Sequence, residues 1–377
     1  MSAQRPIKVV TIMGTRPEMI RLSRVIARLD RMTVHIVVHT GQNYDYELNE
    51  IFFDDLGLRR PDHFLNVATS SLGATLGDIL VKVEGVLERE RPHAVLVLGD
   101  TNSCISAVMA RRMRIPVYHL EAGNRCFDAN VPEEVNRRMV DHVADYNLVY
   151  TEHARRNLLG EGIHPSRIML TGSPMREVLD HHQKAISNSA ALSRQGFIPD
   201  EYLLASLHRE ENVDDPARFS SLLRALRALG TEYGLPVLVS THPRTRKRLE
   251  HQPPELTEKL ILHPPFRFTD YVRLQQSARV VLSDSGTISE ESIMLGFPAV
   301  TLRDSIERPE AVDSGGIVCT GVDVDAIVDA VAIVLDQYQH EGRPAIPAEY
   351  SVPDTSRRVV NFIRSTVHNR RLREASL

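Results

Sequence analysis

A chain of 377 residues is long for one layered core, so we expect two domains of roughly 150 to 200 residues each. Hydrophobic residues make up 42% and charged residues 25% of the chain, as in an ordinary globular protein, and no segment approaches the roughly 20 consecutive apolar residues that cross a bilayer. The formal net charge of −4, without a run of five or more like charges, gives no sign of a nucleic-acid partner.

The start of the chain predicts a strand and not a signal peptide. A lysine leads into a short apolar run at 7–13, which ends in a Gly-Thr-Arg-Pro turn without a small-residue cleavage site. The three cysteines, Cys104, Cys126 and Cys319, are widely spaced and form no C-x-x-C pair, which argues against a disulfide framework and a zinc site. We therefore expect a cytoplasmic protein without a metal site or cofactor.

Short β-branched runs recur between longer helical patterns in the first half of the chain. They are apolar on both faces, which is typical of parallel strands that helices cover on both sides. The runs lie at 7–13, 34–40, 94–100, 117–120, 146–151 and 168–173. The pattern predicts a doubly wound α/β domain over residues 1–180.

A polar, weakly patterned stretch at 181–201 interrupts this alternation, and we interpret it as the region between the domains. Six further runs lie at 202–208, 237–242, 260–263, 280–284, 299–303 and 316–321. They predict a second α/β domain of similar size over 181–354. The last segment, 355–377, has apolar residues at helical spacing, and we expect it to pack back on the first domain.

Polar residues cluster after nearly every predicted strand. In open parallel sheets ligands bind outside the carboxyl ends of the strands, so these clusters mark the expected site. The clusters are Gly14-Thr15-Arg16, Thr40-Gly41-Gln42, Gly99-Asp100-Thr101, 119–123, His208-Arg209-Glu210, Thr241-His242, Asp284-Ser285-Gly286 and Arg303-Asp304. Each domain thus has a rim, the row of polar residues at the carboxyl ends of its strands. Two such rims facing each other would form a cleft between the domains.

The segment 283–296 is the clearest candidate for an anion site. Backbone N–H groups of Gly286 and Thr287, at the start of a predicted helix, suit a diphosphate. Arg308 lies a short way beyond, and a guanidinium binds phosphate through two parallel hydrogen bonds. The alternative is a plain N-cap at Ser285.

Other candidates also have a simple structural alternative. Arg16 can be an arginine exposed to solvent in a loop. Asp100 can be the N-cap of a helix, and His208 can be a structural histidine whose hydrogen bonds are all made within the protein. The Glu290-Glu291 pair either complements the helix dipole or accepts hydrogen bonds from sugar hydroxyls.

Three carboxylates fall on the first rim. Glu121 directly follows a strand, where no helix face would solvate it. Glu133 and Arg137 can form an i,i+4 pair on a helix that begins with a proline. Combined with Asp100 on the same rim and with His208 and the anion site on the second, they would hold an activated sugar by its diphosphate and offer acid/base groups to it.

These segments together resemble the non-hydrolysing UDP-N-acetylglucosamine 2-epimerase family. The family's motifs occur in the expected order over most of the chain: GTRPE, GDT, the HLEAG to PEEVNRR block, HRE at 208, THP at 241, DSG followed by two glutamates, and RDSIERPEAV. The resemblance implies a GT-B-like fold of two Rossmann-like domains with a cleft between them, a C-terminal helix that crosses back, and a homodimer.

The resemblance also implies a reaction, inversion at C2 of a UDP-2-acetamido sugar. The C2 proton is removed, UDP is expelled to leave a 2-acetamidoglycal, and UDP is added again with a proton delivered to the opposite face. The proton leaves one face and returns to the other while a diphosphate departs, so several acid/base groups and positive charge are needed. The positions that match the family's catalytic residues are Asp100, Glu121, Glu133 and His208. The positions that match its substrate or diphosphate contacts are Arg16, Arg137, His242, Ser285, Gly286, Glu291 and Arg308.

Four positions depart from the family's common pattern. Arg21 stands where the UDP-N-acetylglucosamine enzymes typically have lysine, and Thr287 stands where they have a second glycine. Phe266 and Tyr271 differ near the expected uracil site. We count Arg21, Tyr271 and Thr287 among the substrate-binding residues, and the departures favour a different sugar.

A narrower resemblance concerns that sugar. GTRPEMIRLSRV, TGQNYDYELNEIFF, LGDTNSC and EAGNRCFD look like the branch that makes UDP-N-acetyl-L-fucosamine from its L-talosamine isomer, for capsule or O-antigen. The alternatives are a UDP-N-acetylglucosamine/UDP-N-acetylmannosamine 2-epimerase, a hydrolysing relative that releases free sugar and UDP, a GT-B glycosyltransferase, and a UDP-sugar sensor that has lost the chemistry.

Overall fold

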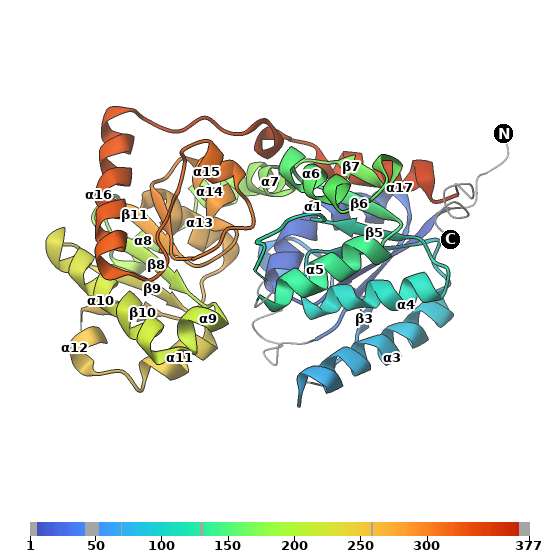
Figure 1. Cartoon of the computed structure of the whole chain (residues 1–377), viewed down its shortest axis with the longest axis horizontal. Helices are drawn as coiled ribbons and strands as arrows, with labels where there is room; N and C mark the ends of the chain where they lie inside the picture. The colour runs from blue at the N-terminus through green and yellow to red at the C-terminus, as the bar shows by residue number, and fades with distance from the viewer. Residues whose placement is uncertain (1–5, 42–52, 69, 129–130, 258, 369–377) are drawn as a thin grey trace. The chain divides into compact units, whose positions relative to one another are not determined.

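The computed structural model describes residues 6–41, 53–68, 70–128, 131–257 and 259–368. Residue contacts divide the chain into two compact units (Figure 1). The first unit takes residues up to His181 and from Ala348 onward, and the second takes His182–Pro347. No helix within the described ranges is long and apolar enough to cross a membrane.

The first unit is built on a sheet of seven parallel strands in the order β3-β2-β1-β4-β5-β6-β7. The strands are β1 (Lys8–Met13), β2 (Val34–His39), β3 (His63–Phe64), β4 (Ala94–Leu98), β5 (Val117–Leu120), β6 (Tyr146–Val149) and β7 (Ile168–Leu170). The six strands predicted in this half are confirmed. Strand β3 is an addition to the prediction, because two residues are too few to show a periodic pattern.

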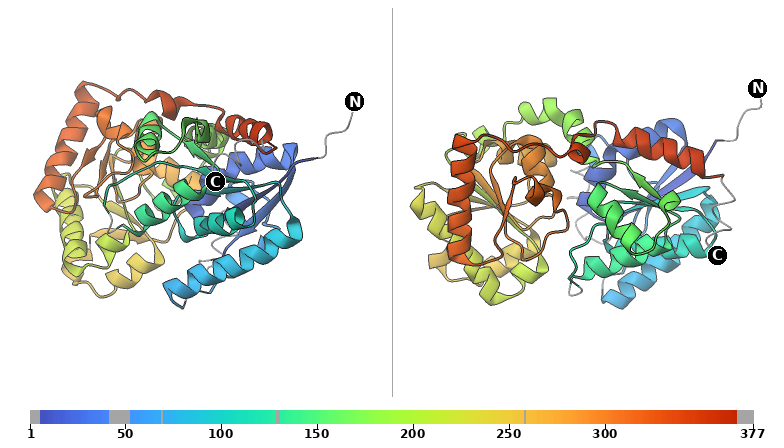
Figure 2. Two further views of the ribbon diagram at one scale, coloured as in Figure 1. Left: turned by 45° about the vertical axis from the view of Figure 1, so that its right-hand side comes forward. Right: turned by 45° about the horizontal axis from the view of Figure 1, so that its top comes forward.

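Helices cover both faces of this sheet. They are α1 (Arg16–Met32), α3 (Leu72–Glu90), η1 (Asn102–Ile105), α4 (Ser106–Arg112), α5 (Pro132–Val143), α6 (Glu152–Gly160), η2 (Pro165–Arg167), the first part of α7 (Met175–Ser187), η3 (Ala348–Ser351) and α17 (Thr355–Thr366). Val117 of β5 packs in a cluster with side chains of α3, α4 and α5, whereas the ring of Tyr118 meets that of Phe362 on α17. Successive side chains of a strand point to opposite faces, so α17 and its neighbour α1 cover the other face (Figure 2).

The second unit is built on six parallel strands in the order β10-β9-β8-β11-β12-β13. The strands are β8 (Leu203–Leu207), β9 (Val237–Thr241), β10 (Leu260–His263), β11 (Val280–Ser283), β12 (Ala299–Thr301) and β13 (Val318–Cys319), and all six match predicted runs. The helices are α8 (Ala191–Gln195), α9 (Glu210–Val213), α10 (Pro216–Glu232), α11 (Pro243–Leu249), α12 (Pro254–Thr257), α13 (Phe268–Ser277), α14 (Ile288–Leu295), α15 (Glu310–Asp313) and α16 (Val324–His340). Side chains of α10 and α16 pack on one face of the sheet, and those of α8, α13 and α14 pack on the other.

The stretch 181–201, which we expected between the domains, holds the end of α7 and all of α8. The division between the two units falls inside α7, between His181 and His182. Residues 42–52, which include most of the TGQNYDYELNEIFF motif, and residues 369–377 of the predicted C-terminal helix lie outside the described residues.

Both sheets reverse their chain order at one central pair of strands. The pair is β1 and β4 in the first unit and β8 and β11 in the second. Loops that leave such a pair diverge to opposite faces and open a crevice at the carboxyl ends of the strands. Arg16 and Asp100 follow the first pair, and His208 and Ser285 follow the second, so the topology places predicted site residues at both crevices.

Candidate active site

Asp100 lies two residues after the end of β4 and pairs with Arg137 of α5. Arg137 is fully buried, and it also lies 3.1 Å from the Glu134 carboxylate and donates to the backbone carbonyl of Asn124 at 3.3 Å. The N-cap of η1 is Thr101 and not Asp100, so the capping alternative for Asp100 is wrong. The Asp100 carboxylate instead faces a buried guanidinium.

Glu121 directly follows β5 and pairs with Arg21 of α1. Both side chains are almost completely buried, and the Nδ2 group of Asn124 lies 3.4 Å from the second carboxylate oxygen of Glu121. The backbone of Glu121 is left-handed, with a φ of 69°. Such a conformation costs a residue with a side chain about 1–3 kcal/mol and is concentrated at functional sites. The Glu121 carboxylate lies beside the end of β4, because a Cβ atom on Gly99 would stand 3.8 Å from its Oε2.

A third carboxylate, Glu18, joins the two loops of this crevice. Its Oε2 accepts hydrogen bonds at 2.9 Å from the backbone of Gly14 and from the Thr15 hydroxyl, and its Oε1 accepts one from Ser103. Burial raises the pKa of Glu18, although these hydrogen bonds act in the opposite direction. Glu18 is not among the predicted site residues, because an acidic residue at this position of GTRPE also suits the first turn of a helix.

The first unit thus holds six of the predicted site residues. Two buried arginines, Arg21 and Arg137, each hold one carboxylate at a strand end. Arg16 is the first residue of α1 and Glu133 lies in the first turn of α5, and both are half-buried.

His208 and Asp284 meet at the crevice of the second unit. The Nδ1 atom of His208 lies 2.9 Å from Oδ1 of Asp284, and the backbone N–H groups of His208 and Arg209 donate to the same carboxylate at 3.1 Å. Burial opposes ionisation of Asp284, but the imidazole and these N–H groups hold its pKa below the usual value. Because Nδ1 is used by Asp284, acid/base chemistry at this ring belongs to Nε2.

The turn from β11 into α14 is where the sequence predicts an anion site. Ser285 Oγ accepts a hydrogen bond from the Thr287 N–H at 3.3 Å, and α14 starts directly after Thr287. A Cβ atom on Gly286 would stand 2.9 Å from Nη1 of Arg308 and 3.3 Å from Nη1 of Arg303, so two guanidiniums crowd this glycine. Backbone N–H groups at a helix start beside two arginines suit a phosphate group.

The two glutamates of α14 differ in their surroundings. Glu290 is fully buried with its Oε1 3.7 Å from Nε of Arg308, whereas Glu291 is half-buried and accepts a hydrogen bond from Gln275 at 2.7 Å. Glu291 is therefore the more exposed member of the pair.

Aromatic rings border the same crevice. Burial raises the pKa of Tyr271, with the nearby Glu291 acting in the same direction. Phe266 stacks on His263 with ring centroids 3.9 Å apart, and its centroid is 6.5 Å from that of Tyr271. His242 directly follows β9 and is half-buried. Phe266 is buried in the core of the second unit, so of this stacked pair only His263 is partly exposed.

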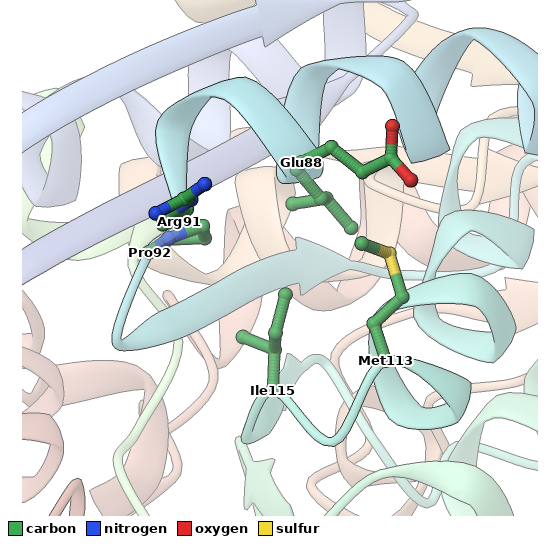
Figure 3. A pocket seen from close by; sticks show the side chains of 6 residues that line it. Glu88, Arg91, Pro92, Met113 and Ile115 are labelled. Atoms are coloured by element: carbon green, nitrogen blue, oxygen red, sulfur yellow. The ribbon is translucent and has the colours of Figure 1, made fainter.

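Two surface hollows lie away from the crevices. One of about 560 Å³ is bordered by Glu88, Arg91 and Pro92 near the end of α3 and by Met113 and Ile115 before β5 (Figure 3). It lies at the amino ends of the strands, on the edge of the sheet opposite the crevice. Another, of about 680 Å³, lies among α9, α10 and α11. Neither hollow includes a predicted site residue, and no metal-binding group of His, Cys, Asp and Glu occurs among the residues that the structure describes.

The two crevices carry different chemistry, with paired carboxylates and arginines in the first unit and an arginine-lined helix start in the second. Two doubly wound units of this kind define a GT-B-like protein that handles a nucleotide sugar. The family model described as UDP-N-acetylglucosamine 2-epimerase matches residues 27–364, and the chain belongs to this family. The protein is a UDP-sugar 2-epimerase.

Relatives with known structures or curated names cover nearly the whole chain. The structure of UDP-N-acetylglucosamine 2-epimerase from Rickettsia bellii is 44% identical, with a TM-score of 0.90 over 96% of this chain and 97% of that one. The Methanocaldococcus jannaschii enzyme in complex with UDP-GlcNAc and UDP is 33% identical, with a TM-score of 0.88 over 95% and 100% of the two chains. The UDP-2,3-diacetamido-2,3-dideoxy-D-glucuronate 2-epimerase of Pseudomonas aeruginosa is 38% identical over 86% of this chain and 91% of its own. The names of these relatives agree on the reaction and differ in the sugar.

Proposed function

We propose that the protein inverts C2 of a UDP-2-acetamido sugar without hydrolysis, by eliminating UDP and adding it again through a 2-acetamidoglycal. The observation that carries this proposal is the pair of strand-end carboxylates, each held by its own buried arginine, Asp100 by Arg137 and Glu121 by Arg21. Proton removal from one face of C2 and return to the other requires more than one acid/base group.

The remaining roles are those that the family resemblance implies for the matching positions. Asp100, Glu121, Glu133 and His208 are the proposed acid/base groups. The proposed contacts to substrate and diphosphate are Arg16, Arg21, Arg137, His242, Tyr271, Ser285, Gly286, Thr287, Glu291 and Arg308. Positive charge at the diphosphate stabilises the leaving UDP. The homodimer that the family resemblance implies stays a prediction, which light scattering after size-exclusion chromatography measures.

We propose the L-talosamine isomer of UDP-N-acetyl-L-fucosamine as the substrate. The support is Arg21, because a planar guanidinium on Glu121 shapes the pocket differently from the compact ammonium of lysine. The P. aeruginosa relative is named for a sugar with different substituents, which supports variation of the sugar within the fold. UDP-N-acetylglucosamine is the second candidate.

Incubation of the enzyme in deuterated water with a panel of UDP-2-acetamido sugars, including 6-deoxy-L isomers, tests the proposal. We expect deuterium at C2 of the epimerised product, seen by NMR, and fastest turnover with the L-talosamine isomer. Epimerised product without label contradicts the elimination mechanism. Accumulation of free sugar and UDP indicates a hydrolysing enzyme, and turnover without an acceptor excludes a glycosyltransferase.

A further inference from the structure

The side chain of His119, in the middle of β5, is fully buried and faces a hydrogen-bond acceptor at each ring nitrogen. Its Nδ1 lies 2.8 Å from Oδ1 of Asp141 on α5, and its Nε2 lies 2.7 Å from the backbone carbonyl of Gly99. A neutral imidazole donates from one nitrogen only, so one of these contacts would set two lone pairs against each other. Either the ring donates from both nitrogens, or Asp141 carries the proton.

The contacts of Asp141 favour the charged ring. Its Oδ2 lies 2.7 Å from Nη1 of Arg125, and the backbone N–H of Gly123 donates to it at 3.2 Å. Donors of this kind stabilise a carboxylate and not a carboxylic acid. Arg125 also makes two hydrogen bonds to Glu161, at 2.7 and 2.8 Å. Two carboxylates against one guanidinium leave one negative charge, which an imidazolium at His119 balances.

We propose that His119 is held as an imidazolium by Asp141 and is a positioning residue for the two strand-end carboxylates. The inference rests on the proposed function of Asp100 and Glu121. The peptide of Gly99 is held by β5 from both ends, since its N–H donates to Leu120 at 2.9 Å and its carbonyl accepts from His119. Asp100 is the next residue after Gly99, so the His119 ring fixes where the Asp100 backbone lies.

The same chain of contacts reaches Glu121. Asp141 accepts a hydrogen bond from the backbone N–H of Gly123, which lies two residues after Glu121 in the same loop. The left-handed backbone at Glu121, where this loop begins, sets the direction of the Glu121 carboxylate. Asp141 lies one turn after Arg137 on α5, and Arg137 holds Asp100. Asp141 contacts Arg125, which also pairs with Glu161. Asp100, Glu18, Asp141 and Arg137 all lie close enough to the buried Cys104 thiol to act on it electrostatically.

The charge of the ring is measured directly by nitrogen NMR on the full-length enzyme labelled with 15N-histidine. The His119 signals are those lost in His119→Gln. We expect both ring nitrogens to be of the protonated type across neutral pH. In Asp141→Asn the amide N–H can face Nδ1, so we expect a neutral ring with its proton on Nε2. A neutral ring in the unmodified enzyme overturns the proposal, and this result does not depend on turnover.

Kinetics test the positioning role. We expect His119→Gln to lower kcat by about 100-fold with KM and UDP affinity close to those of the unmodified enzyme, because reacting groups misplaced by about 1 Å lose that much rate. In Asp141→Asn the acid limb of the kcat/KM profile should move to higher pH, since the carboxylates lose a neighbouring cation. Unchanged kcat and an unmoved acid limb in folded variants would overturn the role.

His35→Gln is the matched control. His35 also contacts an aspartate through Nδ1, with Asp30 at 2.6 Å, but its Nε2 faces the Thr11 hydroxyl at 2.8 Å, which can donate or accept. This pair requires no charged ring and lies at the amino end of β2, away from the carboxyl ends that carry the proposed site, so kcat should be kept. If no UDP-sugar shows C2 exchange, the proposed function fails while the nitrogen spectrum still decides the charge of His119.

Discussion

At the scale of single residues, Arg21 determines how the first unit holds Glu121. A guanidinium is planar, always charged and able to bond a carboxylate through a fixed fork, whereas an ammonium is a compact point charge. The Arg21–Glu121 pair is almost fully buried, and removal of one partner of such a pair typically costs about 3–5 kcal/mol because the other charge stays behind. For any variant of Glu121, both the free energy of unfolding and kcat therefore have to be measured.

Replacement of Glu121 by glutamine should abolish the chemistry and keep UDP bound. The amide keeps the shape of the side chain but cannot take a proton, so we expect kcat to fall by about 100- to 10,000-fold. The arginine-lined helix start that we assign to the diphosphate belongs to the second unit and is unchanged. Label exchange at C2 and calorimetric titration with UDP measure the two effects. Glu88→Gln, on the exposed face of α3, is the control, and full turnover in Glu121→Gln contradicts the assignment.

Glu18→Gln should destabilise the first unit. Glu18 accepts hydrogen bonds at both oxygens, so an amide sets its N–H groups against donors, at a cost of about 1–3 kcal/mol. The pKa of Glu18 is higher in the folded protein than in the unfolded chain. Glu18 therefore contributes fully to the free energy of unfolding below its unfolded-state pKa, and this contribution is lost as pH rises through its folded-state pKa. Urea unfolding followed by circular dichroism should show the gap between the two proteins narrowing as pH rises, and a gap that widens would contradict this account.

At the scale of elements, the loop between β5 and α5 has one position that only glycine fits. Gly123 has a φ of 81°, and a Cβ atom there would stand 2.4 Å from the backbone carbonyl of Ala154 in α6. The close approach of this loop to α6 is what places the Gly123 N–H on Asp141. An added methyl group must push the loop away from α6.

Gly123→Ala should therefore lower both stability and activity. Left-handed strain costs about 1–2 kcal/mol, and overpacking against backbone adds about 1–3 kcal/mol. The matched control is Gly77→Ala on the exposed face of α3, where nothing lies within 4 Å of the new methyl group. That change should stabilise by about 0.5–1 kcal/mol, since alanine favours a helix over glycine. Thermal melting of both variants measures the difference, and equal melting temperatures would refute the packing argument.

Strands and strand ends were predictable from sequence for a physical reason. A strand of a covered parallel sheet is apolar on both faces, so the runs ending at Leu98 and Leu207 stand out, and polar residues that follow them mark the carboxyl edge. The partners of those residues were not predictable. Glu18 and Ser103 are 85 positions apart and meet only because β1 and β4 are neighbours in the sheet. Sequence spacing carries no information about such pairs.

At the scale of the whole molecule, acidification should destabilise the protein partly through His39. This ring is fully buried and stacks on Phe64, and burial lowers its pKa from 6.5 to about 4. A lowered folded pKa gives stability that is present above pH 6.5 and lost as pH falls towards 4. A shift of this size corresponds to about 3 kcal/mol.

Comparison with His39→Gln isolates this contribution. Glutamine does not titrate, and its carbonyl can accept the Gly41 N–H that Nδ1 of His39 accepts at 3.0 Å. Asp284 also loses its stabilising contacts in acid, but it is present in both proteins. We expect the free energy of urea unfolding to fall less steeply with acid in the variant, and equal slopes over this range would contradict the prediction.

Only the first of the two units includes residues from the C-terminal end of the chain. The second unit is one continuous segment, whereas the first needs the returning residues from Ala348 onward. In α17, Val360 and Ile363 are almost fully buried, and Phe362 packs edge-on against Tyr118 and Tyr146. A chain that ends at Pro347 leaves this apolar face of the first sheet exposed.

Truncation after Pro347 should therefore unfold the first unit and spare the second. Loss of two such aliphatic side chains and an aromatic ring removes several kcal/mol, at about 1.5–3 kcal/mol each, which is comparable with the whole stability of a domain. Hydrogen exchange should show β1 to β7 losing protection while β8 to β13 keep it. Within the full chain, Ile363→Ala should cost about 2–5 kcal/mol, and the exposed Asn361→Ala should cost little. Protection of β1 to β7 in the truncated chain would mean that the first unit is stable without its returning segment.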